Sequence, residues 1–161
     1  MKPKLYLEST IPSYYVARPS RDLVTAAHQQ ITRDWWARRA KDFDICISQV
    51  VLDEVGAGDL EMANARRKLI KDFPVLDLSP VAIDLADALM RSGPLPSKAG
   101  HDALHIALAA VHHVHFLLTW NCTHIANAEM FDKIRRLCDR HGFNAPVMCT
   151  PDELMKGTRH D

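Results

Sequence analysis

With 161 residues, the chain is long enough for one domain with a sizeable core, and its 47% hydrophobic and 25% charged residues are typical of a globular protein. The formal net charge of zero excludes recognition of nucleic acid through a global positive field, so such a partner would be held by local patches. No apolar run has the length of a signal peptide or a membrane span, and the four cysteines show no C-x-x-C spacing. We therefore expect a cytoplasmic protein with reduced thiols and no membrane partner.

Strand and helix signals alternate along the chain. Short hydrophobic runs predict strands at residues 4–7, 44–47, 74–78, 114–118 and 146–149. Capping residues and helical periodicity predict helices at residues 22–40, 48–55, 60–71, 79–92, 101–110 and 126–141, with a last short helix after Thr150. Ile11-Pro12-Ser13 is expected to form a loop. The alternation predicts one α/β domain over residues 1–161, with three α/β/α layers and a central, mainly parallel sheet of about five strands.

Four polar residues lie where a parallel sheet gathers its ligands. Glu8 and Asn121 follow predicted strands, whereas Glu54 and Asp102 are expected in the first turns of helices. In right-handed βα units each strand ends and the next helix begins at the same edge, so all four should lie at the carboxyl edge. Three carboxylates and an amide would repel one another without a cation, and oxygen ligands select Mg²⁺ or Mn²⁺. In the alternative interpretation, the helical acids only complement helix dipoles and Glu8 is a solvated turn residue.

Four stretches of the sequence carry a resemblance to a known family. They are Leu5-Tyr6-Leu7-Glu8-Ser9-Thr10, Ser48 to Glu54, His101-Asp102-Ala103-Leu104-His105-Ile106-Ala107, and Leu117-Leu118-Thr119-Trp120-Asn121. In order and approximate spacing they resemble the PIN domain and, within it, the VapC-type toxins of toxin–antitoxin pairs. The resemblance implies a Mg²⁺- or Mn²⁺-dependent endoribonuclease, with RNA as its substrate and a cognate antitoxin as its partner.

Glu8, Glu54, Asp102 and Asn121 fall where this family keeps its acids, so the resemblance implies that they form the catalytic and metal site. Asp102 and Glu8 would hold the metal directly, Glu54 would hold metal or orient the attacking water, and Asn121 would complete the coordination. No nucleophilic side chain is needed, because cations can stabilise both the attacking and the leaving oxygen. Glu8 and Asn121 stand where the family most often has Asp, which lengthens one ligand and removes one charge.

Several alternatives remain open at this stage. A PIN-like module weakened in catalysis by Asn121 could bind RNA or protein without cleaving, and a metal-dependent phosphohydrolase could act on small phosphoesters. His101 and His105, four residues apart, could bind zinc in a relative of the H-E-x-x-H motif, or could be satisfied histidines that support other ligands. The His101-Asp102 pair also resembles HD-type phosphohydrolases, which are all-helical.

Aromatic and basic residues suggest contacts with partners. Tyr14 and Tyr15 could stack on bases of single-stranded RNA, although ordinary partly buried aromatics are the alternative. Trp35 and Trp36 cannot face the same way on one helix, so one is expected at an interface with an antitoxin or with a second copy in a homodimer. The basic runs that could contact phosphates, or simply be solvated, are Arg38-Arg39, Arg66-Arg67-Lys68 and Arg135-Arg136.

Overall fold

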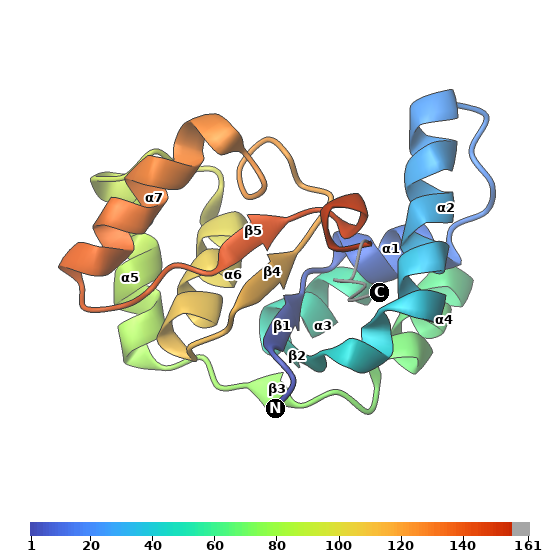
Figure 1. Ribbon diagram of the computed structural model, residues 1–161, viewed down its shortest axis with the longest axis horizontal. Coiled ribbons are helices and arrows are strands. Elements are labelled where there is room, and N and C mark those ends of the chain that lie inside the picture. The colour runs from blue at the N-terminus through green and yellow to red at the C-terminus, as the bar shows by residue number, and fades with distance from the viewer. Residues whose placement is uncertain (156–161) are drawn as a thin grey trace, which may run out of the picture.

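A parallel five-stranded sheet forms the centre of the computed structural model, which describes residues 1–155 (Figure 1). The strand order is β3-β2-β1-β4-β5, and every neighbouring pair is parallel. The strands are Lys4–Leu7 (β1), Asp44–Ser48 (β2), Val75–Leu76 (β3), Phe116–Leu118 (β4) and Val147–Cys149 (β5). The predicted α/β class and the mainly parallel sheet of about five strands are therefore confirmed.

Helices cover the sheet in two groups. In Figure 1, α2 and α4 lie on one side of the strands and α5 and α7 on the other. The helices are Thr10–Val16 (α1), Leu23–Arg38 (α2), Gln49–Val55 (α3), Leu60–Ile70 (α4), Pro80–Arg91 (α5), Gly100–Val111 (α6) and Ala128–Arg140 (α7), with 3-10 turns at Ala40–Asp42 and Pro151–Leu154. Within residues 1–155, none of these helices combines the length and hydrophobicity that a bilayer crossing needs.

Strand β1 lies in the middle of the sheet and is buried on both faces. Leu5, Tyr6 and Leu7 are fully buried, and Leu5 pairs with Ile45 of β2 and with Phe116 of β4. Such a strand carries a continuous apolar run, as the sequence suggested. Glu8, the residue that follows β1, therefore lies at the centre of the carboxyl edge of the sheet.

Local sequence signals account for several helix starts. The Ser48 side chain accepts a hydrogen bond from the Val51 N–H and so caps α3, and Ser79 caps α5 with Pro80 at its first position. At the last turn, the Thr150 N–H donates to Glu153 Oε1 at 3.1 Å, as in a capping box. These contacts satisfy backbone groups that have no partner within the helix.

Two expectations about the local structure were wrong. Residues 11–13 do not form a loop but lie in α1, because Pro12 is in the first helical turn, where a missing N–H removes no intrahelical hydrogen bond. Glu54 is not in the first turn of its helix. Because α3 begins at Gln49, directly after the Ser48 cap, Glu54 is the sixth of seven helical residues.

Candidate metal site at the carboxyl edge

Glu8 is the buried acid at the centre of the edge. Its side chain is only 3% exposed, and its Oε1 accepts hydrogen bonds from the Thr10 N–H at 3.1 Å, from the Thr10 hydroxyl, and from the Thr119 hydroxyl at 2.7 Å. Its Oε2 accepts from the Ser9 hydroxyl at 2.9 Å. These neutral donors fix the carboxylate in one orientation but supply no opposite charge.

Glu54 is the second acid of the site and reaches it from α3. The Ser9 hydroxyl lies 3.2 Å from Glu54 Oε1 as well as 2.9 Å from Glu8 Oε2, so its single proton is shared between the two carboxylates. Burial would raise the pKa of Glu54, but hydrogen bonding and charge from His105, with help from Ser9 and His101, lower that pKa below its usual value. Glu54 is therefore an ionised ligand candidate.

His105 of α6 holds Glu54 in place. Its side chain is fully buried, with Nε2 2.5 Å from Glu54 Oε1 and Nδ1 2.6 Å from the Tyr6 hydroxyl. The Tyr6 hydroxyl also lies 2.6 Å from Ser48 Oγ. Because burial raises the pKa of Tyr6 well above its usual value, the phenol keeps its proton and works as a hydrogen-bonding group.

Asp102 and Asn121 meet through a residue for which the sequence analysis predicted no role, His124. Asp102 Oδ2 lies 2.8 Å from His124 Nδ1, and Asn121 Oδ1 accepts from the His124 N–H at 3.0 Å. The Asn121 N–H donates to the Thr119 hydroxyl at 2.9 Å, and that hydroxyl donates to Glu8. The four predicted site residues thus belong to one connected hydrogen-bond network, although Asp102 and Asn121 join it indirectly.

A group of side chains in residues 1–155 that could hold a metal ion contains two of the four predicted residues. Among residues 1–155, one ligand atom each from Glu8, Glu54 and His105 lie within 4.8 Å of one another. Asp102 is not in this group, and neither is His101, whose Nδ1 lies 3.6 Å from Glu54 Oε2. Carboxylate oxygens and an imidazole nitrogen are ordinary ligands of divalent cations, so these side chains fit an ion.

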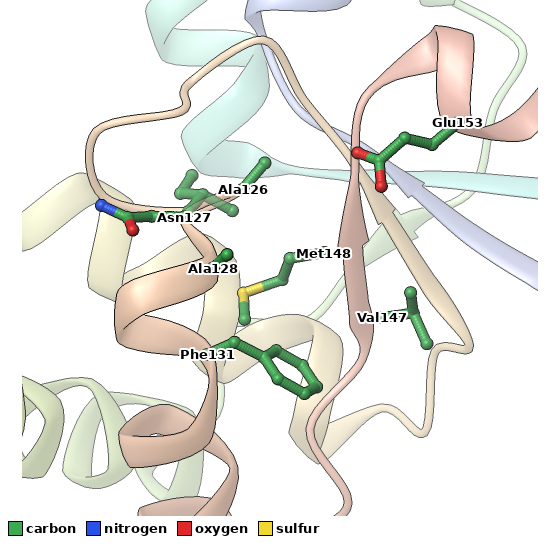
Figure 2. A pocket seen from close by; sticks show the side chains of 8 residues that line it. Ala126, Asn127, Ala128, Phe131, Val147, Met148 and Glu153 are labelled. Carbon is green, nitrogen blue, oxygen red and sulfur yellow. The ribbon is translucent and has the colours of Figure 1, made fainter.

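A separate cavity of about 330 Å³ lies between β5 and α7 and shares no residue with the acidic group. Figure 2 shows Phe131, Met148 and Glu153 among the side chains that line this cavity. Its walls are mainly apolar and lack paired acids. The cavity is therefore separate from the acidic side chains at the carboxyl edge.

The predicted interface residues have mixed outcomes. Trp35 is fully buried, and Trp36 is partly buried with its ring 5.3 Å from Tyr15 and 6.0 Å from Phe73, so neither tryptophan is the exposed marker that we expected. The two tryptophan rings are not coplanar, with an interplanar angle of 73°, but Tyr15 and Phe73 pack against the Trp36 ring. Tyr14 is half-buried beside Trp120, and its stacking on an RNA base stays a prediction.

The structure has the arrangement of a known fold. A comparison with solved structures matches 91% of this chain to 97% of a chain of VapBC2 from Rickettsia felis, crystallised with a DNA fragment from its promoter, with a TM-score of 0.58 and 17% sequence identity. The chain has a PIN-like fold. Neither a protein-family model nor a curated protein matches the sequence. The PIN-like sheet also excludes the all-helical HD-type alternative.

Acid should destabilise the metal-free protein partly through Glu54. Because the pKa of Glu54 is lower in the folded state, its stabilising contribution is present above the usual carboxyl range and is lost as the pH falls below it. Between about pH 7 and about pH 3, the free energy of unfolding of wild type should fall more steeply than that of Glu54→Gln. Urea unfolding in EDTA measures both slopes, and parallel slopes would contradict the stabilisation of the Glu54 carboxylate by its contact with His105.

Proposed function

We propose that the protein is a metal-dependent endoribonuclease, cleaving RNA phosphodiesters at the site around Glu8 and Glu54. The observation that carries the proposal is this pair of acids, joined by Ser9 at the carboxyl edge of a PIN-like sheet. Among residues 1–155, no lysine or arginine forms an ion pair with either carboxylate. A buried carboxylate held only by neutral donors, as Glu8 is, is costly, and a divalent cation offsets that cost.

The chemistry follows from charge. A bound Mg²⁺ or Mn²⁺ would stabilise the negative charge that builds up on the phosphate during cleavage. The residues of the chain supply position: neutral donors from Ser9, Thr10 and Thr119 hold Glu8, and His105 holds Glu54. Such preorganisation lets the ligands act without rearranging during the reaction.

Asp102 and Asn121 are proposed to complete the site from its other side. Asp102 would bind metal or a metal-bound water, and Asn121 would contribute its carbonyl oxygen. Both side chains hydrogen-bond to His124 rather than directly to Glu8 or Glu54. This arrangement also favours a second candidate function, an RNA- or protein-binding module with little catalysis.

The partners follow from the fold relationship. One similar solved structure is that of VapBC2 bound to a DNA fragment from its promoter, and the sequence resembles VapC-type toxins. We therefore propose that this chain is the toxin of a toxin–antitoxin pair, with RNA as substrate and a cognate antitoxin as protein partner. Copies of the chain could also pair as a homodimer.

A cleavage assay separates the candidate functions. The purified protein is incubated with a structured RNA and, separately, with a small phosphoester, in Mg²⁺, in Mn²⁺ and in EDTA. Metal-dependent cleavage inside the RNA chain supports the proposal. Hydrolysis of the small ester alone indicates a phosphohydrolase, and RNA binding without cleavage in any metal indicates the binding module. Activity restored by Zn²⁺ alone would favour the zinc alternative.

Asn121→Asp should tighten Mn²⁺ binding by about tenfold, or about 1.4 kcal/mol. The new carboxylate adds a charge near the ion, and it can still accept the His124 N–H that Asn121 Oδ1 accepts now. Without metal, added repulsion with the other acids should lower the melting temperature. Thermal melts with and without Mn²⁺ measure both effects. If neither melt moves, Asn121 does not belong to the metal site.

A further inference from the structure

We infer that His105 is itself a metal ligand, and that its Nε2 gives the site a preference for Mn²⁺ over Mg²⁺. The inference rests on the proposed function only in that both use the same edge of the sheet. It replaces an all-oxygen site with one in which Glu8, Glu54 and His105 share an ion.

The positions of the three side chains fit a single ion. The ligand atoms come from the residue after β1, from α3 and from α6, and they lie within 4.8 Å of one another. Two ligands at about 2.1 Å from one ion can be at most about 4.2 Å apart, so only small side-chain movements are needed. His105 Nε2, now 2.5 Å from Glu54 Oε1, would move slightly apart to admit the ion.

The His105 ring is already oriented as a metal-binding imidazole. In metal sites the second ring nitrogen is usually fixed by a hydrogen-bonding partner. Here the Tyr6 hydroxyl occupies that place at 2.6 Å from Nδ1, and the ring is fully buried, so Nε2 is directed at the carboxylates. The Tyr6 hydroxyl can accept from Nδ1–H while donating to Ser48 Oγ, so the ring can bind an ion through Nε2 once the proton that Nε2 shares with Glu54 is released.

The negative charges of Glu8 and Glu54 also favour a cation at this position. Glu8 is 3% exposed and its hydrogen-bond donors are all neutral. Within residues 1–155 the groups that pair with Glu54 are the histidines at 101 and 105, one exposed and one fully buried. A cation among Glu8, Glu54 and His105 would compensate both carboxylates at once.

The nitrogen ligand decides the choice of ion. Mg²⁺ is a hard cation that prefers oxygen, whereas imidazole nitrogen suits softer divalent metals such as Zn²⁺, Fe²⁺ and Ni²⁺, and Mn²⁺ lies between these groups. Mn²⁺ accepts carboxylate oxygen and also benefits from nitrogen. Loss of a side chain that supports a metal site commonly costs about 10–100-fold in affinity, so loss of a direct ligand should cost at least about tenfold for Mn²⁺ and much less for Mg²⁺.

Pulsed electron paramagnetic resonance of Mn²⁺ bound to the wild-type protein tests the inference directly. A metal-bound imidazole produces nitrogen modulation, which should change when the histidines are labelled with ¹⁵N. The modulation should be lost in His105→Gln and kept in His101→Ala, the control for the exposed histidine beside Glu54. The labelled wild type gives an answer even if His105→Gln does not fold.

The outcomes separate this inference from the proposed function. Calorimetry should show tighter binding of Mn²⁺ than of Mg²⁺ by wild type, and His105→Gln should lose most of that difference. Mn²⁺ binding without histidine modulation would overturn the inference and leave His105 as a positioning residue for Glu54, while metal-dependent RNA cleavage would still support the proposed function. Absence of Mn²⁺ binding overturns the inference, and absence of cleavage with either metal overturns the proposed function.

Discussion

Glu8→Gln should reduce metal-dependent RNA cleavage by more than about a hundredfold while leaving the fold in place, since even residues that only support metal ligands contribute about 10–100-fold. Glutamine keeps the size of the side chain, and its amide oxygen can still accept from Thr10 and Thr119. The charge that attracts the cation is lost. Initial cleavage rates at saturating Mn²⁺ measure the effect, and circular dichroism checks the fold.

Asp53→Asn is the matched control for this variant. Asp53 lies next to Glu54 on α3, but its side chain is exposed and bonds to Gln49 on the same helix. Removing its charge changes the net charge of the protein as much as Glu8→Gln does. The control should cleave at the wild-type rate. Equal activity of Glu8→Gln and Asp53→Asn would show that Glu8 is not part of the reaction.

Trp35→Ala should lower the free energy of unfolding by about 3–5 kcal/mol, the usual cost of removing a buried aromatic ring from a core. Trp35 is fully buried on α2, and its ring stacks on Phe43 with a centroid distance of 5.8 Å. The truncation leaves a cavity that the surrounding helices and strands can fill only in part. Urea unfolding monitored by circular dichroism gives the value.

Trp35→Phe should cost much less than Trp35→Ala. Phenylalanine keeps an aromatic ring against Phe43, and it removes the Trp35 Nε1–H, which is buried without a hydrogen-bond partner among the described residues. The lost indole volume and the removed unsatisfied donor act in opposite directions. If both variants were equally destabilised, the loss would not come from aromatic packing in the core.

The sequence predicted the architecture well because its signals are local. Apolar runs mark strands buried on both faces, and Ser48 and Ser79 mark helix starts. The carboxyl edge then follows from parallel topology alone, which is why Glu8 could be placed there. The helix α1 was missed because a proline was interpreted as a break, although its effect depends on its position within the helix.

The contacts between site residues could not be predicted because they depend on how helices pack. Glu54 meets His105 only because α3 and α6 are neighbours, and no sequence spacing reports that contact. His124 was overlooked for the same reason, since its ring contacts Asp102 of another segment, although its backbone contact with Asn121 is local. Thr119 gave a weak signal, as a polar residue directly after an apolar strand.

A crystal soaked in Mn²⁺ and measured for anomalous scattering gives the most direct test that this edge of the sheet is a metal site. We expect an anomalous peak at ligand distance from carboxylate oxygens of both Glu8 and Glu54. A peak that also reaches Asp102 would add that residue to the ligands. Full occupancy of Mn²⁺ elsewhere in the protein, with no peak between Glu8 and Glu54, would contradict the account.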